Sequence, residues 1–294
     1  MKRSISDYLR LAEIGNRLRD AFELWGYCEI VFPAIEEYSD EIRKGTKFAH
    51  GNGFYLINPD VTSRIIKNFS DGRTRLYYIS EVLDGGVRGK WEAGVEFIGG
   101  RDVSMHVEIL LVAITALESL GIEEFYIDVG SLEVWKEATR GIEPFRDEIM
   151  RALQRRNFGI IESLPISPGR KHRLWELFNF RGKRSGLEKL DAIIEAVEDE
   201  RVFLDFGTVR PLPYYTDVIF EIYSPKLGKP IGGGGEYEVK GKKAIGFALD
   251  MNALLKLYKG RKREGKRLSG DSVKEVYSKA RELVKMGIPV EVDV

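Results

Sequence analysis

The sequence predicts an α+β fold in which a mainly antiparallel sheet is flanked by helices. Helical and strand patterns alternate along the chain, but without the even β-α-β spacing that a parallel sheet requires. Late in the chain, strand patterns follow one another directly between residues 202 and 249, which is typical of antiparallel pairing. A strong helical pattern from Met105 to Leu120, ended by Gly121, supplies a flanking helix.

The first half of the chain begins with apolar residues at helical spacing, which predict a helix. Ser4 to Asp7 form a capping start for this helix, and Gly26 ends it. A strand from Tyr27 to Phe32 follows and stops at Pro33. Asn58-Pro59 then signals a second helix with proline in its first turn. Further strands are expected over residues 76–82, 94–98 and 125–129.

The second half begins with a variable helical stretch over residues 132–200. Strands are then expected over residues 202–206, 214–223 and 244–249, with a glycine turn at Gly232 to Gly235. We expect one core domain over residues 1–270 and a short helix–strand appendage over residues 271–294.

The composition is that of a soluble globular protein, for which the cytoplasm is the expected location. The chain has 294 residues, with 46 basic and 46 acidic side chains, so there is no global electrostatic attraction to nucleic acid or to an anionic membrane. Cys28 is the only cysteine, which excludes an intramolecular disulfide and a cysteine-rich metal site. No apolar run reaches the 18 residues of a membrane-spanning helix.

The segment Glu92-Ala93-Gly94-Val95-Glu96 places two carboxylates on one face of a predicted strand. They are about 13 Å apart along the strand, from a rise of about 3.3 Å per residue. Gly94 leaves a floor without a side chain between them, which suits a small polar molecule such as an amino acid. The alternative is that both glutamates are solvated or paired with lysines.

Six segments, read in order, resemble class II aminoacyl-tRNA synthetases, and histidyl-tRNA synthetases in particular. Residues 26–36 resemble motif 1, which forms a dimer interface in that class, and residues 92–99 resemble the strand that closes motif 2. Residues 210–216, Arg-Pro-Leu-Pro-Tyr-Tyr-Thr, are similar to a signature of histidine-handling members. The other similar segments are Asn58 to Thr62, Ile231 to Tyr237 and Gly246 to Leu249. The resemblance implies the class II synthetase core fold.

The resemblance also implies a histidine-binding pocket. The matching positions assign Asp60, Thr62 and Glu92 to the α-amino group, and Glu96 and Tyr215 to the imidazole ring. Arg210 would face the α-carboxylate or balance charge, and Tyr214 stands beside Tyr215 in the signature. Carboxylates suit an ammonium group, and an imidazole N–H needs an acceptor. The alternative for Tyr215 is packing in the core with its hydroxyl satisfied.

Two departures affect the part of the family pattern that binds ATP. Asp84 stands where motif 2 carries an arginine, and Ala253 stands where motif 3 carries another. Such arginines clamp phosphate oxygens, so their loss predicts that the adenylation site is gone. The loop from Gly85 to Trp91 is also short for the family. We therefore expect no catalytic residues, no cofactor and no metal.

A histidine-shaped pocket without an ATP site resembles the regulatory subunits of short-form ATP phosphoribosyltransferase. That resemblance implies a non-catalytic subunit that activates the catalytic subunit and mediates feedback inhibition by histidine in histidine biosynthesis. It also implies a homodimer through the motif 1 region within a larger hetero-oligomer, with no membrane or nucleic-acid partner.

Two other functions are compatible with the sequence. The first is a synthetase paralogue that activates an amino acid for a non-tRNA acceptor, against which Asp84 and Ala253 argue. The second is an RNA-binding module, which rests on the basic run at Lys256, Lys259, Arg261, Lys262, Arg263, Lys266 and Arg267. A solvated loop is the simpler interpretation of that run. We expect His50, His106 and His172 to be ordinary surface or helix residues.

Overall fold

The computed structural model describes residues 4–42, 45–83, 86, 89–210, 212, 214–260 and 265–293. It divides into two compact units, Met1–Tyr258 and Lys259–Val294. The domain boundary expected after residue 270 lies inside the second unit, between β13 (Lys266–Ser269) and α10 (Val273–Lys285). No helix in the described ranges is long and apolar enough to cross a membrane.

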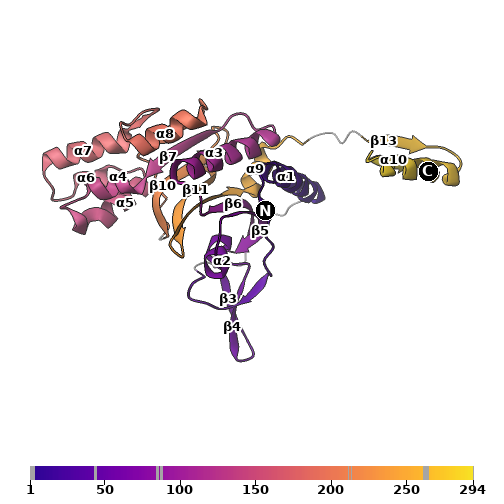
Figure 1. Cartoon of the computed structure of the whole chain (residues 1–294), viewed down its shortest axis with the longest axis horizontal. Coiled ribbons are helices and arrows are strands. Elements are labelled where there is room, and N and C mark those ends of the chain that lie inside the picture. Colours follow the sequence, from indigo (N-terminus) through magenta and orange to yellow (C-terminus); the bar gives the residue numbers. More distant parts are fainter. Residues whose placement is uncertain are drawn as a thin grey trace. The chain divides into compact units, whose positions relative to one another are not determined.

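The first unit alternates helices and strands (Figure 1). Its first elements are α1 (Ile5–Leu24), β1 (Cys28–Glu29), β2 (Ile35–Glu37), β3 (Thr46–His50), β4 (Gly53–Ile57), α2 (Val61–Asn68), β5 (Thr74–Leu83), β6 (Gly89–Ile98) and α3 (Asp102–Ser119). The next are β7 (Tyr126–Ser131), α4 (Leu132–Ala138), η1 (Glu143–Phe145), α5 (Arg146–Gln154), α6 (Gly159–Glu162), α7 (Pro168–Asn179), β8 (Arg181–Gly182) and α8 (Glu188–Val197). The last are β9 (Val202–Asp205), β10 (Tyr215–Tyr223), β11 (Pro230–Val239), β12 (Lys242–Asp250) and α9 (Met251–Leu257).

The described strands of this unit form a nine-stranded sheet in the order β1-β5-β6-β12-β11-β10-β7-β9-β8 and a three-stranded sheet, β2-β4-β3. Within the described part of the large sheet, only the pairs β1–β5 and β7–β9 are parallel. The predicted α+β class with a mainly antiparallel sheet is therefore confirmed.

The two faces of the large sheet are covered differently. Leu11 of α1, Ile109 of α3, Leu190 of α8 and Leu254 of α9 belong to the main core, together with inward residues of the strands. The opposite face carries a smaller cluster around α2, which includes Ile65 and the strand residues that pack with it. The sheet thus has one thickly covered face and one partly open face, and the open face can hold a ligand.

Several local predictions hold. Ser4 and Asp7 form a reciprocal capping box at the start of α1, and Gly26 follows the helix with a φ of 77°. The strand expected over residues 27–32 is shorter, because only Cys28–Glu29 pairs with β5. Helix α2 starts after Asp60, whose side chain accepts from the Ser63 backbone N–H, so the proline precedes the helix and does not lie in its first turn.

The glycine turn expected at Gly232 to Gly235 is wrong. These residues lie inside β11 and pair with β10 on one side and β12 on the other. Glycine is needed here for space, since a Cβ at Gly234 would lie 1.9 Å from the carbonyl oxygen of Gly246. A run of glycines usually signals a turn, and the pairing that overrides this signal comes from segments distant in the sequence.

The second unit is small. Strands β13 and β14 (Val290–Asp293) pair in parallel, and α10 connects them. Val276, Ala280 and Leu283 of α10 are its buried residues. The sequence predicted the helix and the last strand, and β13 is an additional element. The basic run is divided between the units, with Lys256 on α9 and Arg267 on β13, while residues 261–263 lie outside the described ranges.

Candidate functional site: a polar pocket on the open face of the sheet

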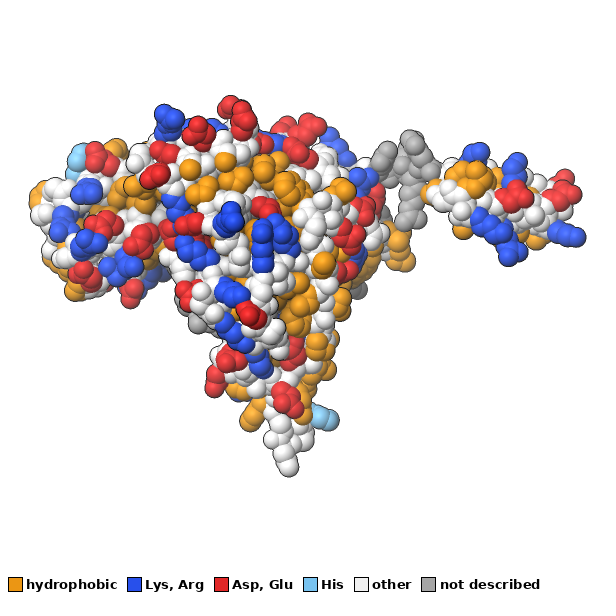
Figure 2. Space-filling model, viewed as in Figure 1, with side chains coloured by type: hydrophobic (Ala, Val, Ile, Leu, Met, Phe, Trp, Pro, Cys, Tyr) orange, Lys and Arg blue, Asp and Glu red, His pale blue; other side chains and the backbone are white. Residues whose placement is uncertain are grey.

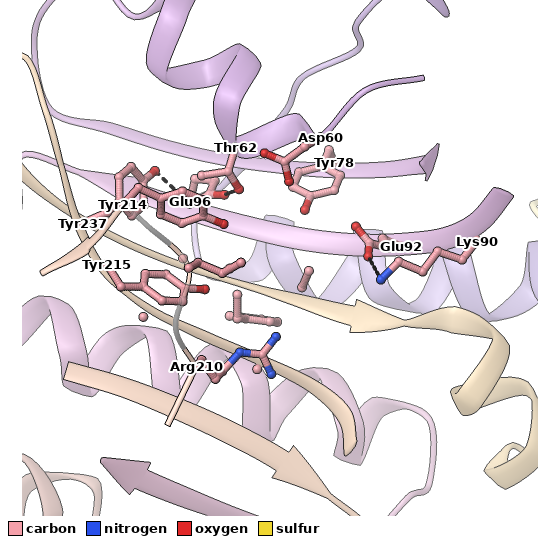
Figure 3. Close-up of a pocket in the computed structure, with 16 residues that line it drawn as sticks. Asp60, Thr62, Tyr78, Lys90, Glu92, Glu96, Arg210, Tyr214, Tyr215 and Tyr237 are labelled. Carbon is pink, nitrogen blue, oxygen red and sulfur yellow. Dashed lines mark hydrogen bonds and ion pairs between the residues drawn. The ribbon is translucent and has the colours of Figure 1, made fainter. Parts of the chain in front are cut away.

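A pocket on the open face of the sheet contains all seven residues that the sequence assigned to ligand binding (Figure 3). It encloses about 530 Å³, including the part open to solvent. Its lining residues are Asp60, Thr62, Tyr78, Lys90, Glu92, Glu96, Arg210, Leu212, Tyr214, Tyr215, Gly233, Gly235, Tyr237, Gly246, Phe247 and Ala248.

The pocket exists because its floor has almost no side chains. Gly233 and Gly235 of β11 and Gly246 of β12 line it, and cross-strand pairing places Gly235 beside Gly246. A Cβ at Gly246 would lie 1.8 Å from the Glu96 carboxylate, and one at Gly233 would lie 2.4 Å from Arg210. The glycines therefore leave room for polar side chains that lie flat on the sheet.

Glu96 is the most deeply buried acid of the pocket, with 2% exposure. Its Oε1 accepts a hydrogen bond from the Thr62 hydroxyl at 2.6 Å, and its Oε2 accepts one from the Tyr237 hydroxyl at 2.8 Å. Burial raises the pKa of Glu96 to about 7, although the two hydroxyl donors act in the opposite direction. Thr62 thus contacts Glu96 directly, and it holds this carboxylate in place.

Asp60 and Glu92 supply the other acidic groups. Asp60 caps α2 and therefore stands at the positive end of the helix. Glu92 forms an ion pair with Lys90 at 2.5 Å, and both residues point toward the pocket in Figure 3. Glu92 and Glu96 share the pocket face of β6, while Val95 and Phe97 face the main core, so the predicted alternation is confirmed.

The slot expected above Gly94 is occupied. Tyr78 is directly opposite Gly94 on β5, and its ring atoms would lie 2.3 Å from a Cβ at that position. Burial raises the pKa of Tyr78 well above its usual value, so the phenol stays neutral. Glu92 and Glu96 are therefore separated by an aromatic hydroxyl, and the expectation of a bare floor between them is wrong.

Three tyrosines form one wall of the pocket. The ring centroids of Tyr214 and Tyr215 are 4.9 Å apart and nearly perpendicular, and Tyr214 packs edge-on to Tyr237 at 6.0 Å. Burial raises the pKa of Tyr215 to about 12, against the opposing effect of Arg210. These phenols can donate or accept hydrogen bonds, but they do not ionise near neutral pH.

Arg210 lies across the pocket from the acids in Figure 3, and its guanidinium lies close to the Gly233 backbone. Its Nη1 is 3.4 Å from Glu221 of β10, which turns the guanidinium toward the sheet. The pocket lining contains Asp60, Glu92 and Glu96 as acids and Lys90 and Arg210 as bases. When Glu96 is ionised, the acids exceed the bases by one, which favours a ligand with a cationic group, and Arg210 provides a separate contact for an anionic group.

The sequence analysis missed Tyr78, Lys90 and Tyr237. Tyr237 stands in the glycine segment that was identified, but no feature of the sequence alone links it to Glu96. Tyr78 could have been found only from its register opposite Gly94. The pairing of β10 with β11 shifts between Tyr215 and Ile219. As a result, Asp217 turns toward Lys189 of α8, while Tyr215 lines the pocket.

A second polar cluster lies on the other side of β11. His106 is a residue of helix α3, one of the two placements expected, but it is fully buried, with Nε2 2.8 Å from Glu236 Oε2, so it is not a surface residue. Asp102, His106 and Glu236 have the ligand types of a metal site. However, the Lys189 ammonium is 2.9 Å from the same Glu236 oxygen and 3.4 Å from Asp102, which places a cation there already.

Of the two residues that stand where the family carries phosphate-binding arginines, the structure describes Ala253 but not Asp84. Ala253 is fully buried on α9 within the main core. No guanidinium extends from this position. Asp84 lies outside the described residues.

Comparison with known proteins gives a consistent result. The sequence profile of the family described as Histidyl-tRNA synthetase matches residues 5–186 and 170–254. A histidine–tRNA ligase from Methanocaldococcus jannaschii is 27% identical, covering 76% of this chain but only 64% of the ligase. An ATP phosphoribosyltransferase regulatory subunit from Caldanaerobacter subterraneus is 29% identical, covering 95% of this chain and 88% of that subunit.

Two solved structures share the fold. An ATP phosphoribosyltransferase regulatory subunit/histidyl-tRNA synthetase from Bacillus halodurans superposes with a TM-score of 0.81 at 24% identity, covering 100% of this chain and 91% of that one. A chain of an ATP phosphoribosyl transferase complex from Thermotoga maritima superposes with a TM-score of 0.68 at 18% identity, covering 81% and 96%.

Proposed function

The chain belongs to the histidyl-tRNA synthetase family, and we propose that it acts within this family as the regulatory subunit of a short-form ATP phosphoribosyltransferase in histidine biosynthesis. Relatives with that name align with most of this chain, whereas the histidine–tRNA ligase extends well beyond the aligned part. The observation that carries the proposal is a preformed polar pocket, lined by acids and tyrosines, on a synthetase core without the motif 3 arginine.

We propose that the pocket binds histidine as the effector. The ammonium group would lie near Asp60 and Glu92, and the imidazole N–H would reach Glu96 or the Tyr215 hydroxyl. Arg210, on the opposite side, suits the α-carboxylate. Thr62 and Tyr237 hold Glu96 in one orientation, so the acceptor for the ring is preorganised.

The adenylation reaction of the synthetases is absent in this proposal. That reaction needs cations that stabilise charge on the phosphate oxygens in the transition state. Ala253 provides none, and its position on α9 is packed inside the core. A bound histidine would therefore be sensed and not activated.

The proposed partner is the catalytic subunit of ATP phosphoribosyltransferase, joined to a homodimer of this chain. The motif 1 region supports the homodimer, because its apolar side chains Val31 and Ile35 are exposed, at 83% and 53%, and Phe54 of the neighbouring strand β4 is 58% exposed. Figure 2 shows orange side chains along one edge of the projection that β3 and β4 form. Val31→Asp should shift the dimer toward monomer in light scattering, and an unchanged mass would place the dimer contact elsewhere.

Calorimetric titration of histidine into the isolated chain tests the pocket. Glu96→Ala should weaken binding by at least about tenfold, the cost of one charge-assisted hydrogen bond. Glu238→Ala is the matched control, because Glu238 is exposed on the same strand as Tyr237. Equal affinity in the native chain and Glu96→Ala would show that the pocket does not bind histidine.

Two activity measurements test the role. Mixing the chain with a short catalytic subunit should raise phosphoribosyl transfer and make it sensitive to histidine, and Glu96→Ala should retain the activation but lose the sensitivity. ATP–pyrophosphate exchange with histidine should stay at background. Robust exchange would instead support the synthetase paralogue.

A further inference from the structure

A second cleft lies on the helical side of the first unit, between α4, α7 and the start of α8. It encloses about 1050 Å³, including the part open to solvent, and most of its accessible lining is apolar, with contributions from Val134, Leu177, Leu187 and Leu190. Leu187 is 43% exposed, although it is a large apolar residue. This cleft is an apolar surface that opens to solvent.

The apolar cleft continues into a basic one. The adjoining space, about 1070 Å³ including the part open to solvent, is lined by Arg140, Arg170 and Arg173, with Glu137 as the acid. Glu137, Ala138 and Arg173 line both spaces, so the two are continuous. One end of the combined cleft is apolar, and the other carries three guanidinium groups.

The charges of the basic end are only partly compensated within the chain. Arg140 forms an ion pair with Glu137, and Arg170 donates to the backbone carbonyl of Arg140 at 2.6 Å, with Glu143 nearby. Arg173 has no hydrogen bond or ion pair with any residue that the structure describes. An uncompensated arginine at the junction of the two spaces is placed to meet an anion.

We propose that this cleft binds a small amphipathic anion, with its apolar body against Val134, Leu177 and Leu187 and its anionic head at Arg173 and Arg170. The apolar part supplies contact area, and guanidinium groups supply charge-assisted hydrogen bonds to a phosphate or carboxylate. Neither end alone suits such a ligand, and their continuity selects a molecule that has both parts.

The cleft is distinct from the pocket on the open face of the sheet. The apolar end reaches Lys189 and Asp217. The Lys189 ammonium donates to Asp217 and to Glu236, and Glu236 lies on the α3 side of β11. Tyr237, the next residue of that strand, faces the other pocket. The thickness of the sheet therefore separates the two sites, and this inference does not depend on histidine binding.

Fluorescence titration of the full chain with two probes tests the proposal. Anilinonaphthalene sulfonate is an amphipathic anion, and phenylnaphthylamine is its neutral parent. Arg173→Ala should lower the affinity for the anionic probe by about tenfold and leave the affinity for the neutral probe within about twofold of the native value. Leu187→Ser should lower the affinity for both probes. Arg155 is an exposed arginine of the same helical region that lines neither space, so Arg155→Ala should leave the affinity for both probes unchanged.

Competition identifies the head group. Octyl phosphate and octanoate should both displace the anionic probe, and the stronger competitor shows which anion the arginines prefer. The proposal is overturned if Arg173→Ala leaves the affinity for the anionic probe unchanged, or if this substitution lowers the affinity for the neutral probe by the same factor. It is also overturned if neither octyl compound competes. Glu96→Ala should leave probe binding intact, so failure here is separable from failure of the histidine site.

Discussion

At the scale of single residues, Glu96 is a carboxyl group that the fold both buries and holds in one orientation. It is buried, and it is an acid whose two oxygens both accept hydrogen bonds from hydroxyl groups. Burial raises the pKa of Glu96 from its usual 4.5 to about 7, so the folded protein holds a proton there that the unfolded chain has lost. The stability of the fold is thereby coupled to pH.

The sign of that coupling gives a first prediction. Between pH 4.5 and 7 the folded state binds the extra proton, so the free energy of unfolding should fall as the pH rises, by about 3 kcal/mol in total. Glu96→Gln cannot ionise and should remove this part of the pH dependence. Urea unfolding of both proteins at pH 5 and pH 8 measures the difference, with Glu238→Gln as the exposed control. Parallel pH profiles for the native chain and Glu96→Gln would contradict the assignment.

Asp60 has two tasks that a pair of substitutions can separate. Its carboxylate caps α2 through the Ser63 backbone N–H and also lines the pocket. Asp60→Ser keeps a capping oxygen, so the free energy of unfolding should change by less than about 0.5 kcal/mol, whereas Asp60→Ala should lose about 1 kcal/mol. Both substitutions should weaken histidine binding in calorimetry. If Asp60→Ser binds normally, the carboxylate serves the helix only.

At the scale of elements, Lys189 ties α8 to two strands and to α3. Its ammonium contacts Asp217 of β10 and Glu236 of β11 at 2.9 Å each, and Glu236 also meets His106 of α3. Burial alone would raise the pKa of Glu236, but His106 and Lys189 lower it to about 2. Four elements thus share one charged centre beneath the sheet.

Removing the cation should therefore loosen this layer. Lys189→Met leaves Glu236 buried with less compensation, and we expect a loss of about 2 kcal/mol in urea unfolding, reduced from the 3–5 kcal/mol of a fully buried pair because Lys189 is partly exposed. The double variant with Glu236→Gln should recover part of this loss. If the loss in the double variant equals the sum of the losses in the two single variants, the two residues do not interact.

The elements also show what a sequence can predict. Helices α1 and α3 have strong helical patterns and form where the sequence predicts them, and the alternation predicted along β6 agrees with the structure. The main error concerns β11, where consecutive glycines hide the strand pattern. The seven site residues came together as expected, but Tyr78 and Tyr237 depend on strand register, which local sequence does not encode.

At the scale of the whole molecule, the two units differ greatly in size. The second has 36 residues, from 259 to 294, and three apolar residues of α10 are buried in it. Units below about 40 residues usually need a disulfide, a metal or a partner for stability. Cys28, the single cysteine, belongs to the first unit, so no disulfide can form within the second unit.

We therefore expect the second unit to open more readily than the first. In hydrogen exchange of the native chain, the amides of α10 should exchange well before those of α3, which lie against the main core. Mass spectrometry of peptides from both helices measures this. Equal protection of α10 and α3 would mean that another surface stabilises the second unit, and repeating the exchange with the catalytic subunit present would test that source.

The four glycines of β11 have a consequence for folding. A strand without side chains carries little information about its own alignment, and a slip by one residue would exchange its two faces. Glu236 and Tyr237 come directly after the glycines and point to opposite sides, one toward His106 and Lys189, the other toward Glu96. A misaligned strand would put an acid beside Glu96 and a phenol among the charged groups. These two neighbours therefore act as markers that let the chain distinguish the correct alignment from its nearest competitor.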